Sequence, residues 1–333
     1  MKYESSKDWK SLCLQDVLLA SKRIHGLILK TPLIESPDLA FRSGAHQVSI
    51  KLESLQHTGA FKLRGAGNKI LSLEEEKRRK GVITFSTGNH GRAVAYTAAK
   101  LGIKAVVCLS EKVPQNRVEM VKALKAEPMI FGQSQDEAED HFEQLIRKHG
   151  YIPVPPFDDP EIIAGQGTVV LEMLQKNPQI DTLLVQLSGG GLLAGAALTA
   201  KSMNPKIKII GVSIQQSPAM LESLKAGKPV EIEEKPTIAG SLSGGIGRKN
   251  EYTLPLIEHY VDEHVLITEE KVIEGMKYAF EKHQLVAEGA AVVGISALLN
   301  HKVDVTGKNV GVMMTGSCVE SKAYLEIIGN VVD

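Results

Sequence analysis

Short apolar runs rich in β-branched residues alternate with helical patterns through most of this chain. A strand is predicted over residues 82–86 and a helix over 88–101, and the same order returns at 104–110 with 115–126 and at 182–187 with 190–202. Further apolar strands are predicted at 207–214 and 309–314. Strands joined by helical crossovers form parallel sheets with helices on both faces. The pattern therefore predicts an α/β protein.

The length of 333 residues suits two domains of ordinary size. The best candidate for a crossing between them is the proline-rich stretch 153–160, because prolines stop the elements on either side. We predict a small mobile domain over 81–158, inserted into a large domain made from 1–80 and 159–333. The alternative is that 153–160 is a loop within a single domain.

Charge and cysteine content narrow the class of protein. The 39 Lys+Arg balance 39 Asp+Glu, so no net field attracts nucleic acid or an acidic membrane. Cys13, Cys108 and Cys318 are too far apart for a zinc site or a disulfide framework. The first residues lack the apolar core of a signal peptide, and the best apolar run, 286–299, is interrupted by Glu288. We expect a cytoplasmic protein without nucleic-acid or membrane partners.

Two predicted strands lead through glycine directly into a helix, and the second of these turns is the more specific. Residues 187–195 read Leu-Ser-Gly-Gly-Gly-Leu-Leu-Ala-Gly. A helix start offers unpaired N–H groups and partial positive charge, and glycines let an anion approach them. A dinucleotide would also need an acidic residue on the next strand, but 207–214 contains none. A phosphate monoester therefore fits better, which disfavours a dinucleotide-dependent oxidoreductase.

The first glycine turn carries polar side chains. Ser86, Thr87, Asn89 and His90 place hydroxyls and an amide beside backbone donors. This is suitable for a carboxylate or a phenolic oxygen. A phosphate cradle with a separate carboxylate cradle suggests a phosphorylated cofactor that is joined to an amino acid.

Lys62 is the candidate nucleophile. An isolated lysine is most often a solvated surface group. Here its neighbours are apolar or small, with Phe61 before it and a glycine-containing loop upstream. Such surroundings lower the pKa of an amine and make it nucleophilic. Together with a phosphate cradle, this indicates a Schiff base with pyridoxal phosphate.

Four motifs follow one another along the chain, at residues 57–66, 86–91, 164–168 and 188–195. In this order they resemble the threonine/serine dehydratase and serine racemase family, the tryptophan-synthase-β-like group of fold type II pyridoxal-phosphate enzymes. Segments 241–250 and 286–291 resemble the hydroxyectoine-utilisation dehydratase branch. The resemblance implies a two-lobed α/β fold, each lobe a mostly parallel sheet flanked by helices, and a homodimer.

The resemblance also implies residue roles. Lys62 would hold the cofactor and remove the substrate α-proton, Phe61 would pack against the pyridine ring, and Asn89 would bond its phenolic oxygen. Thr315 would place a hydroxyl beside the pyridine nitrogen. The phosphate would bind the N–H groups of Ser188, Gly189, Gly190, Gly191 and Leu192. The substrate carboxylate would bind Ser86, Thr87, Asn89 and His90.

The Thr315 hydroxyl, unlike a carboxylate, cannot keep the pyridine nitrogen protonated. The carbanion left when the substrate loses its α-proton would therefore be short-lived, which favours prompt loss of a β-substituent over transamination. We therefore expect a lyase that dehydrates and deaminates a β-hydroxy amino acid, such as threonine or serine, to a 2-oxo acid and ammonia. The resemblance to the hydroxyectoine-utilisation branch further implies a role in hydroxyectoine-type catabolism.

Two alternatives stay open. One is an amino-acid racemase of the serine or aspartate type, with Thr87 as the acid/base opposite the lysine. The other is an amino-acid sensor without turnover. Ser213 stands where many family members have a cation-binding glutamate, so we predict no metal site.

Overall fold

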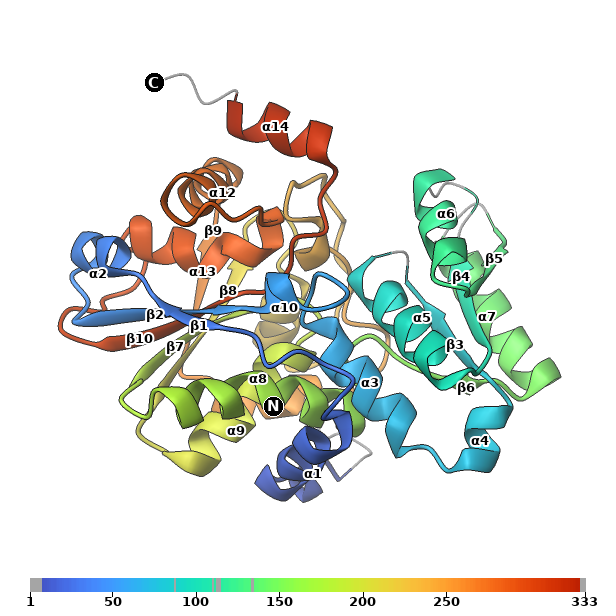
Figure 1. Ribbon diagram of the computed structural model, residues 1–333. Helices are drawn as coiled ribbons and strands as arrows, with labels where there is room; N and C mark the ends of the chain where they lie inside the picture. Colours follow the sequence, from blue (N-terminus) through green and yellow to red (C-terminus); the bar gives the residue numbers. More distant parts are fainter. Residues whose placement is uncertain (1–7, 87, 110, 112–114, 133–134, 330–333) are drawn as a thin grey trace.

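Two sheets organise the computed structural model, which describes residues 8–86, 88–109, 111, 115–132 and 135–329. Figure 1 shows a larger lobe around one sheet and a smaller lobe around the other. In the described residues the large sheet has six strands in the order β1-β2-β10-β7-β8-β9, and the small sheet has four in the order β5-β4-β3-β6. The α/β prediction is confirmed.

The large sheet is parallel except at one edge, where β1 pairs antiparallel with β2. Its strands are β1 (Leu33–Glu35), β2 (Gln47–Leu52), β7 (Thr182–Gln186), β8 (Lys208–Ile214), β9 (Glu263–Ile267) and β10 (Asn309–Met314). The central strand β7 is buried along its whole length. Leu183 and Val185 enter one apolar cluster and Leu184 enters the other, as expected when successive side chains point to opposite faces.

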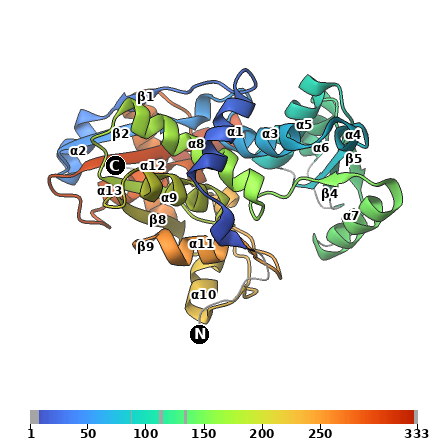
Figure 2. The same cartoon turned by 90° about the horizontal axis from the view of Figure 1, so that it is seen from below.

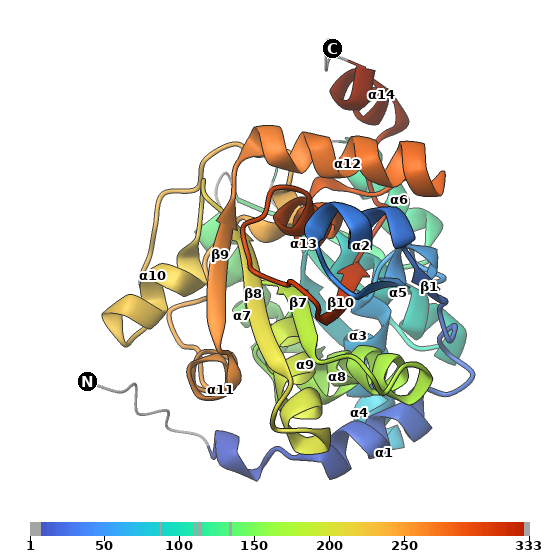
Figure 3. The ribbon, with the colours of Figure 1, turned by 90° about the vertical axis from the view of Figure 1, so that its left-hand side faces the viewer.

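Helices cover both faces of the large sheet (Figure 3). One face packs against α8 (Pro160–Lys176) and α9 (Gly191–Met203), with α1 (Leu14–Ile24) and α11 (Thr253–Tyr260) outside them. The other face packs against α2 (Pro37–Ser43), α12 (Glu269–His283) and α13 (Gly289–Leu299). Outlying helices are α10 (Ala219–Ala226) and α14 (Ser321–Gly329). None of the helices within the described ranges is long and apolar enough to cross a membrane.

The small lobe is a parallel sheet of β3 (Val82–Phe85), β4 (Ala105–Leu109), β5 (Glu127–Ile130) and β6 (Ile152–Pro153). Helices α5 (Asn89–Leu101) and α6 (Gln115–Ala123) cover one face, and α7 (Gln135–His149) covers the other. Apolar residues of both kinds of element fill the two clusters between them. The lobe therefore has a core of its own.

Helix α3 (Lys62–Ser72) lies between the lobes (Figure 2) and is followed by α4 (Glu75–Arg79). Its residues Leu63, Ala66 and Ile70 belong to the apolar cluster of the small lobe, although they precede residue 81 in the chain. Ile162 of α8 belongs to the same cluster. The division at residues 81 and 158 stays a prediction, and both α3 and the start of α8 contact the small lobe.

Candidate active site

Lys62 is the first residue of α3 and is held at the carboxyl end of β10. The Phe61 N–H donates to the Thr315 carbonyl at 3.0 Å, and Ala60 forms an antiparallel bridge with Gly316. Thr315 directly follows β10 and is 3% exposed. Phe61, predicted to pack against the cofactor ring, and Thr315, predicted to lie beside its nitrogen, are thus joined by a backbone hydrogen bond at the carboxyl ends of the strands, where ligands of parallel α/β proteins usually bind.

The Lys62 amine lies in an environment that favours its neutral form. Its Nζ donates to the Pro156 carbonyl at 2.8 Å and lies 5.4 Å from the centre of the Phe61 ring. Burial lowers the pKa of this amine to about 8, although the negative charge of Glu288 opposes the shift. About a tenth of the amine is therefore unprotonated, and nucleophilic, at pH 7, which is far more than at the ordinary pKa of lysine.

The triple-glycine turn joins β7 to α9 and cannot accept side chains. Gly190 has φ of +91°, and a Cβ at Gly189 would clash with the Phe157 ring. Within the described residues, no side chain caps the start of α9. The first N–H groups of α9 therefore remain available, together with the positive end of the helix dipole, which suits a phosphate.

The other glycine turn joins β3 to α5 and carries Ser86, Asn89 and His90, whereas Thr87 lies outside the described residues. The Ser86 Oγ accepts from the Gly88 N–H at 3.3 Å. His90 Nε2 contacts the Val154 carbonyl at 2.9 Å, so Nε2 must be the donor. Burial, with the nearby Lys62 charge, lowers the pKa of His90 to about 3. A neutral His90 would bind a carboxylate through its backbone N–H in the first turn of α5.

Glu288 completes the site and was not among the predicted site residues. It precedes α13, is 8% exposed, and its Oε1 accepts from Asn89 Nδ2 at 2.7 Å and from Ser241 Oγ at 3.4 Å. A Cβ at Gly316 would lie 2.7 Å from the same oxygen. The carboxylate therefore joins the two lobes beside Thr315. The signal in the sequence was the single charge in the apolar run 286–299.

A second missed segment is the strap that leaves the small lobe, residues 154–159. Pro156 accepts from the Lys62 amine, and Phe157 packs on Gly189 and Gly191. Asp158 accepts three backbone N–H groups at the start of α11, from Glu251, Tyr252 and Thr253, at 2.6, 2.9 and 2.8 Å. The prolines predicted a crossing between lobes, but sequence offered no sign that the crossing lines the site.

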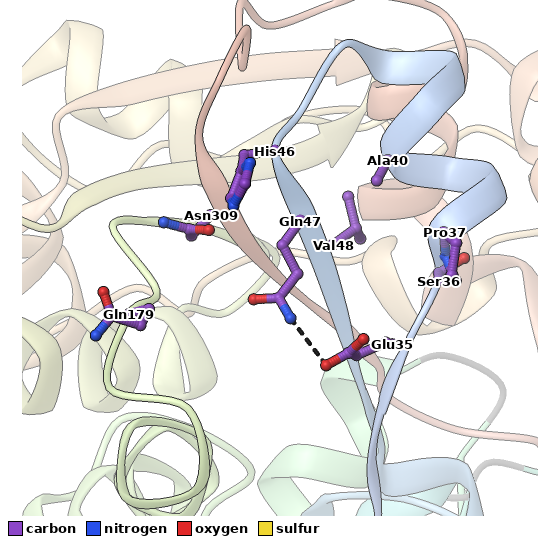
Figure 4. Close-up of a pocket in the computed structure, with 9 residues that line it drawn as sticks. All are labelled: Glu35, Ser36, Pro37, Ala40, His46, Gln47, Val48, Gln179 and Asn309. Atoms are coloured by element: carbon purple, nitrogen blue, oxygen red, sulfur yellow. Dashed lines mark hydrogen bonds between the residues drawn. The ribbon is translucent and has the colours of Figure 1, made fainter.

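A separate surface cavity of about 380 Å³ lies at the opposite ends of the strands, where β2 and β10 begin (Figure 4). Its lining includes His46 and Gln47, where β2 begins, and Asn309, where β10 begins. None of the predicted site residues lines it. Among the residues that the structure describes, no group of three or more His, Cys, Asp or Glu side chains could hold a metal ion.

Comparison with known proteins identifies the class. The model of the pyridoxal-phosphate dependent enzyme family matches residues 24–316, and the chain belongs to this family. It is 37% identical to an L-threonine ammonia-lyase of Thermotoga maritima, over 95% of this chain and 78% of that protein. It is also 37% identical to an L-threo-3-hydroxyaspartate ammonia-lyase of Saccharomyces cerevisiae, over 96% of this chain and 97% of that protein. The structure of maize serine racemase superposes with a TM-score of 0.89 at 30% identity, covering 94% of this chain and 96% of that one.

The geometry fits pyridoxal phosphate. The packing around the glycine turn leaves no room for a Cβ at Gly189 or Gly190, the start of α9 has no side-chain cap within the described ranges, and Lys62 supplies an amine of lowered pKa. Asn89 Oδ1 and His90 Nδ1 are buried and, among the described residues, have no hydrogen-bond partner. Buried polar atoms without partners are costly, and a polar ligand between the lobes would satisfy them.

Proposed function

We propose that this chain is a pyridoxal-phosphate-dependent ammonia-lyase that converts a β-hydroxy amino acid, such as threonine or serine, to a 2-oxo acid and ammonia. The observation that carries the proposal is the placement of a part-buried lysine of lowered pKa at the same ends of the strands as a glycine turn that no described side chain caps. The ammonia-lyases among its relatives support this reaction class. The proposed role in hydroxyectoine-type catabolism rests on the sequence resemblance alone.

The bound cofactor would supply an aldehyde for Lys62 and an electron-withdrawing ring for the substrate α-carbon. The backbone N–H groups of residues 188–192 would hold its phosphate, with Phe61 against the ring and Asn89 at the phenolic oxygen. Lys62 would also be the group that accepts the substrate α-proton. With the β-hydroxyl lost as water, the amino acid would end as a 2-oxo acid and ammonia.

Ser86, Thr87, Asn89 and the backbone of His90 would hold the substrate carboxylate at the start of α5. Thr315 offers the pyridine nitrogen a hydroxyl instead of a carboxylate. Because a hydroxyl does not keep that nitrogen protonated, long-lived carbanion chemistry such as transamination is disfavoured and elimination is favoured.

The proposal is tested by trapping the cofactor and measuring turnover. Borohydride reduction of the cofactor-loaded protein should place a pyridoxyl label on Lys62, detected by peptide mass spectrometry. Lys62→Ala should abolish both the label and 2-oxo acid release. The control is Lys77→Ala, which removes an exposed lysine of α4. Unlabelled Lys62 in folded, cofactor-saturated wild-type protein would refute the proposal.

A racemase that uses the same site is the second candidate, favoured by the close superposition on maize serine racemase. Thr87 would then exchange a proton on the face opposite Lys62. L-serine separates the two reactions, because a lyase releases pyruvate and ammonia whereas a racemase releases D-serine. A sensor would bind the amino acid and produce neither.

We also propose a cytoplasmic homodimer with a mobile small domain over 81–158. The widely spaced cysteines support the compartment, and the general frequency of two-fold assemblies supports the dimer. Phe41 on α2 and Leu325 on α14 are 90% and 62% exposed, which leaves apolar surface for a second copy. Light scattering that gave a monomer at working concentration would contradict the dimer.

A further inference from the structure

Helix α3 presents two chemically different faces to the two lobes. Leu63, Ala66 and Ile70 pack into the apolar cluster of the small lobe. The other face carries Arg64 and Asn68, one helical turn apart, and both contact α8. Hydrogen bonds and ion pairs fix direction as well as distance, whereas apolar contacts tolerate sliding. The two faces therefore hold α3 to the two lobes with different rigidity.

Arg64 is the centre of the polar face and is 0% exposed. Its Nε and Nη2 each donate at 2.8 Å to one oxygen of Glu53, which follows β2. Nη1 and Nη2 donate at 2.8 and 2.9 Å to the two oxygens of Glu172 on α8, and Nη1 also reaches Thr168 Oγ1 at 3.2 Å. Two carboxylates thus grip one planar guanidinium, the geometry in which arginine is most strongly oriented.

The charges in this buried cluster balance. Lys51 on β2 donates to Glu172 Oε2 at 2.6 Å and to the Thr31 carbonyl at 2.7 Å, so two cations meet two carboxylates. Burial works against the charge on Arg64, but Glu53 and Glu172 hold the pKa of its guanidinium above the ordinary value. The Arg64 guanidinium therefore keeps its charge throughout the working pH range, and a change of pH does not release it.

The contacts between α3 and α8 are also unusually close. A Cβ at Gly165 would lie 2.7 Å from the Gly65 Cα, so two glycines meet where the helices cross. Next along, a Cβ at Gly195 of α9 would lie 2.7 Å from the Gly167 backbone nitrogen on α8. Helices α3, α8 and α9 are thus packed backbone to backbone in series. One end of this block carries Lys62, and the other begins at the triple-glycine turn.

We propose that Arg64 is a positioning residue for Lys62: by clamping the first turn of α3 to Glu53 and Glu172, it keeps the amine aligned with the glycine turn of α9 while the small lobe moves over the apolar face of α3. This inference rests on the proposed function and deepens it. Arg64 lies two residues after Lys62 and acts through the helix backbone, without touching cofactor or substrate.

The test uses the full-length protein with Arg64→Lys, which keeps the charge but loses the two-pronged donor. Lys51→Met is the matched control, because it removes a buried cation from the same cluster but from a residue outside α3. Three quantities are measured for each: the melting temperature, the pH dependence of Lys62 acetylation in cofactor-free protein by mass spectrometry, and kcat and KM for the cofactor-loaded enzyme.

Arg64→Lys should lower kcat by about 100-fold, the size of loss that a misplaced reacting group can cause, with a smaller change in KM. The midpoint of Lys62 acetylation should move to higher pH, because the amine would reach water. Lys51→Met should lower the melting temperature without moving that midpoint. If Arg64→Lys does not fold, Glu172→Gln, which weakens the same clamp, takes its place and should move the midpoint in the same direction.

The proposal would be overturned if the midpoint of Lys62 acetylation were the same in wild type, Arg64→Lys and Glu172→Gln. It would also be overturned if Lys51→Met moved that midpoint as far as Arg64→Lys does, at the same loss of stability. Failure of the proposed function is distinguishable, because wild-type Lys62 would then acquire no pyridoxyl label although its acetylation midpoint still responded to Arg64→Lys.

Discussion

The two glycine turns have the same order of elements but different construction. Behind β7, a Cβ at Gly190 would lie within 3 Å of Ile257, Met220 and Thr253, and φ there is +91°. Behind β3, Gly88 has φ of −100°, and a Cβ there would meet nothing within 4 Å among the described residues. One turn is enclosed by the large lobe, while the other opens into space between the lobes.

The difference matches the ligand groups that the turns are proposed to hold. A phosphate that stays bound through every turnover suits fixed backbone donors, which need no reorganisation. A substrate carboxylate arrives and leaves, and the open turn offers it side chains on the smaller lobe. The same strand–glycine–helix arrangement can therefore bind a group that stays in place or one that exchanges in each turnover, depending on the packing around its glycines.

Gly190→Ala tests the difference between the two turns most directly, because it alters the enclosed turn alone. A side chain at this positive φ costs about 1–3 kcal/mol before any clash is counted. We expect cofactor affinity to fall at least about tenfold, because the N–H groups of the turn must move. Titration of the visible cofactor band would measure this, with thermal unfolding of the cofactor-free protein as the stability control. Unchanged affinity would mean that the enclosed turn does not bind the phosphate.

Asn89→Ala should give the next largest effect. It removes a hydrogen bond to a buried carboxylate, and such bonds contribute about 1.5–3 kcal/mol. We expect a lower melting temperature and a raised substrate KM, measured on cofactor-saturated protein. Asn89→Gln, which keeps the amide, is the matched control. A change in stability without any change in KM would remove Asn89 from the substrate site.

The contribution of sequence to this picture differs from element to element. The predicted helices at 88–101 and 190–202 agree with α5 and α9 to within one residue at each end, because each helix begins directly after a glycine turn, which is a local feature. Both glycine turns were likewise predictable from the sequence, because strand, glycine and helix are adjacent in the chain. The resemblance then assigned Lys62, Asn89 and Thr315 to one site.

Residues that act across the fold were not predictable in this way. Glu288 meets Asn89 from 199 positions away, and Arg64 meets Glu172 from 108. The single charge in the apolar run 286–299 marks Glu288 as unusual, but no local pattern reveals its distant partner. Their roles become visible only when tertiary packing shows which charges are buried together. The strap at Pro156 is similar, because its chemistry depends on a backbone carbonyl and not on a side chain.

Glu288→Gln sharpens the comparison through pH. The Glu288 charge raises the pKa of Lys62 against the effect of burial, so removing it should take that pKa below about 8. The rate of cofactor capture, which needs the neutral amine, should become half-maximal about one pH unit lower. Stopped-flow absorbance at a series of pH values tests this. A midpoint that moved upward would contradict the assigned sign, and Glu270→Gln provides an exposed control.

Gly88→Ala should have the smallest effect. With open space around it and a negative φ, the added methyl should change stability by no more than about 0.5 kcal/mol. We expect kcat/KM within about threefold of wild type, measured beside Gly190→Ala under identical conditions. Equal damage from both substitutions would show that the two turns are equally constrained in solution.

The position of β10 in the large sheet sets the order of assembly. This strand pairs with both β2 and β7, yet its residues 309–314 are translated after both of these neighbours. During synthesis, β2 and β7 lack their shared neighbour, and Thr315 and Gly316 are not yet available to support Lys62. Until β10 is added, the nascent large sheet lacks the strand between β2 and β7. The large lobe can therefore bind the cofactor only after β10 has paired with both neighbours.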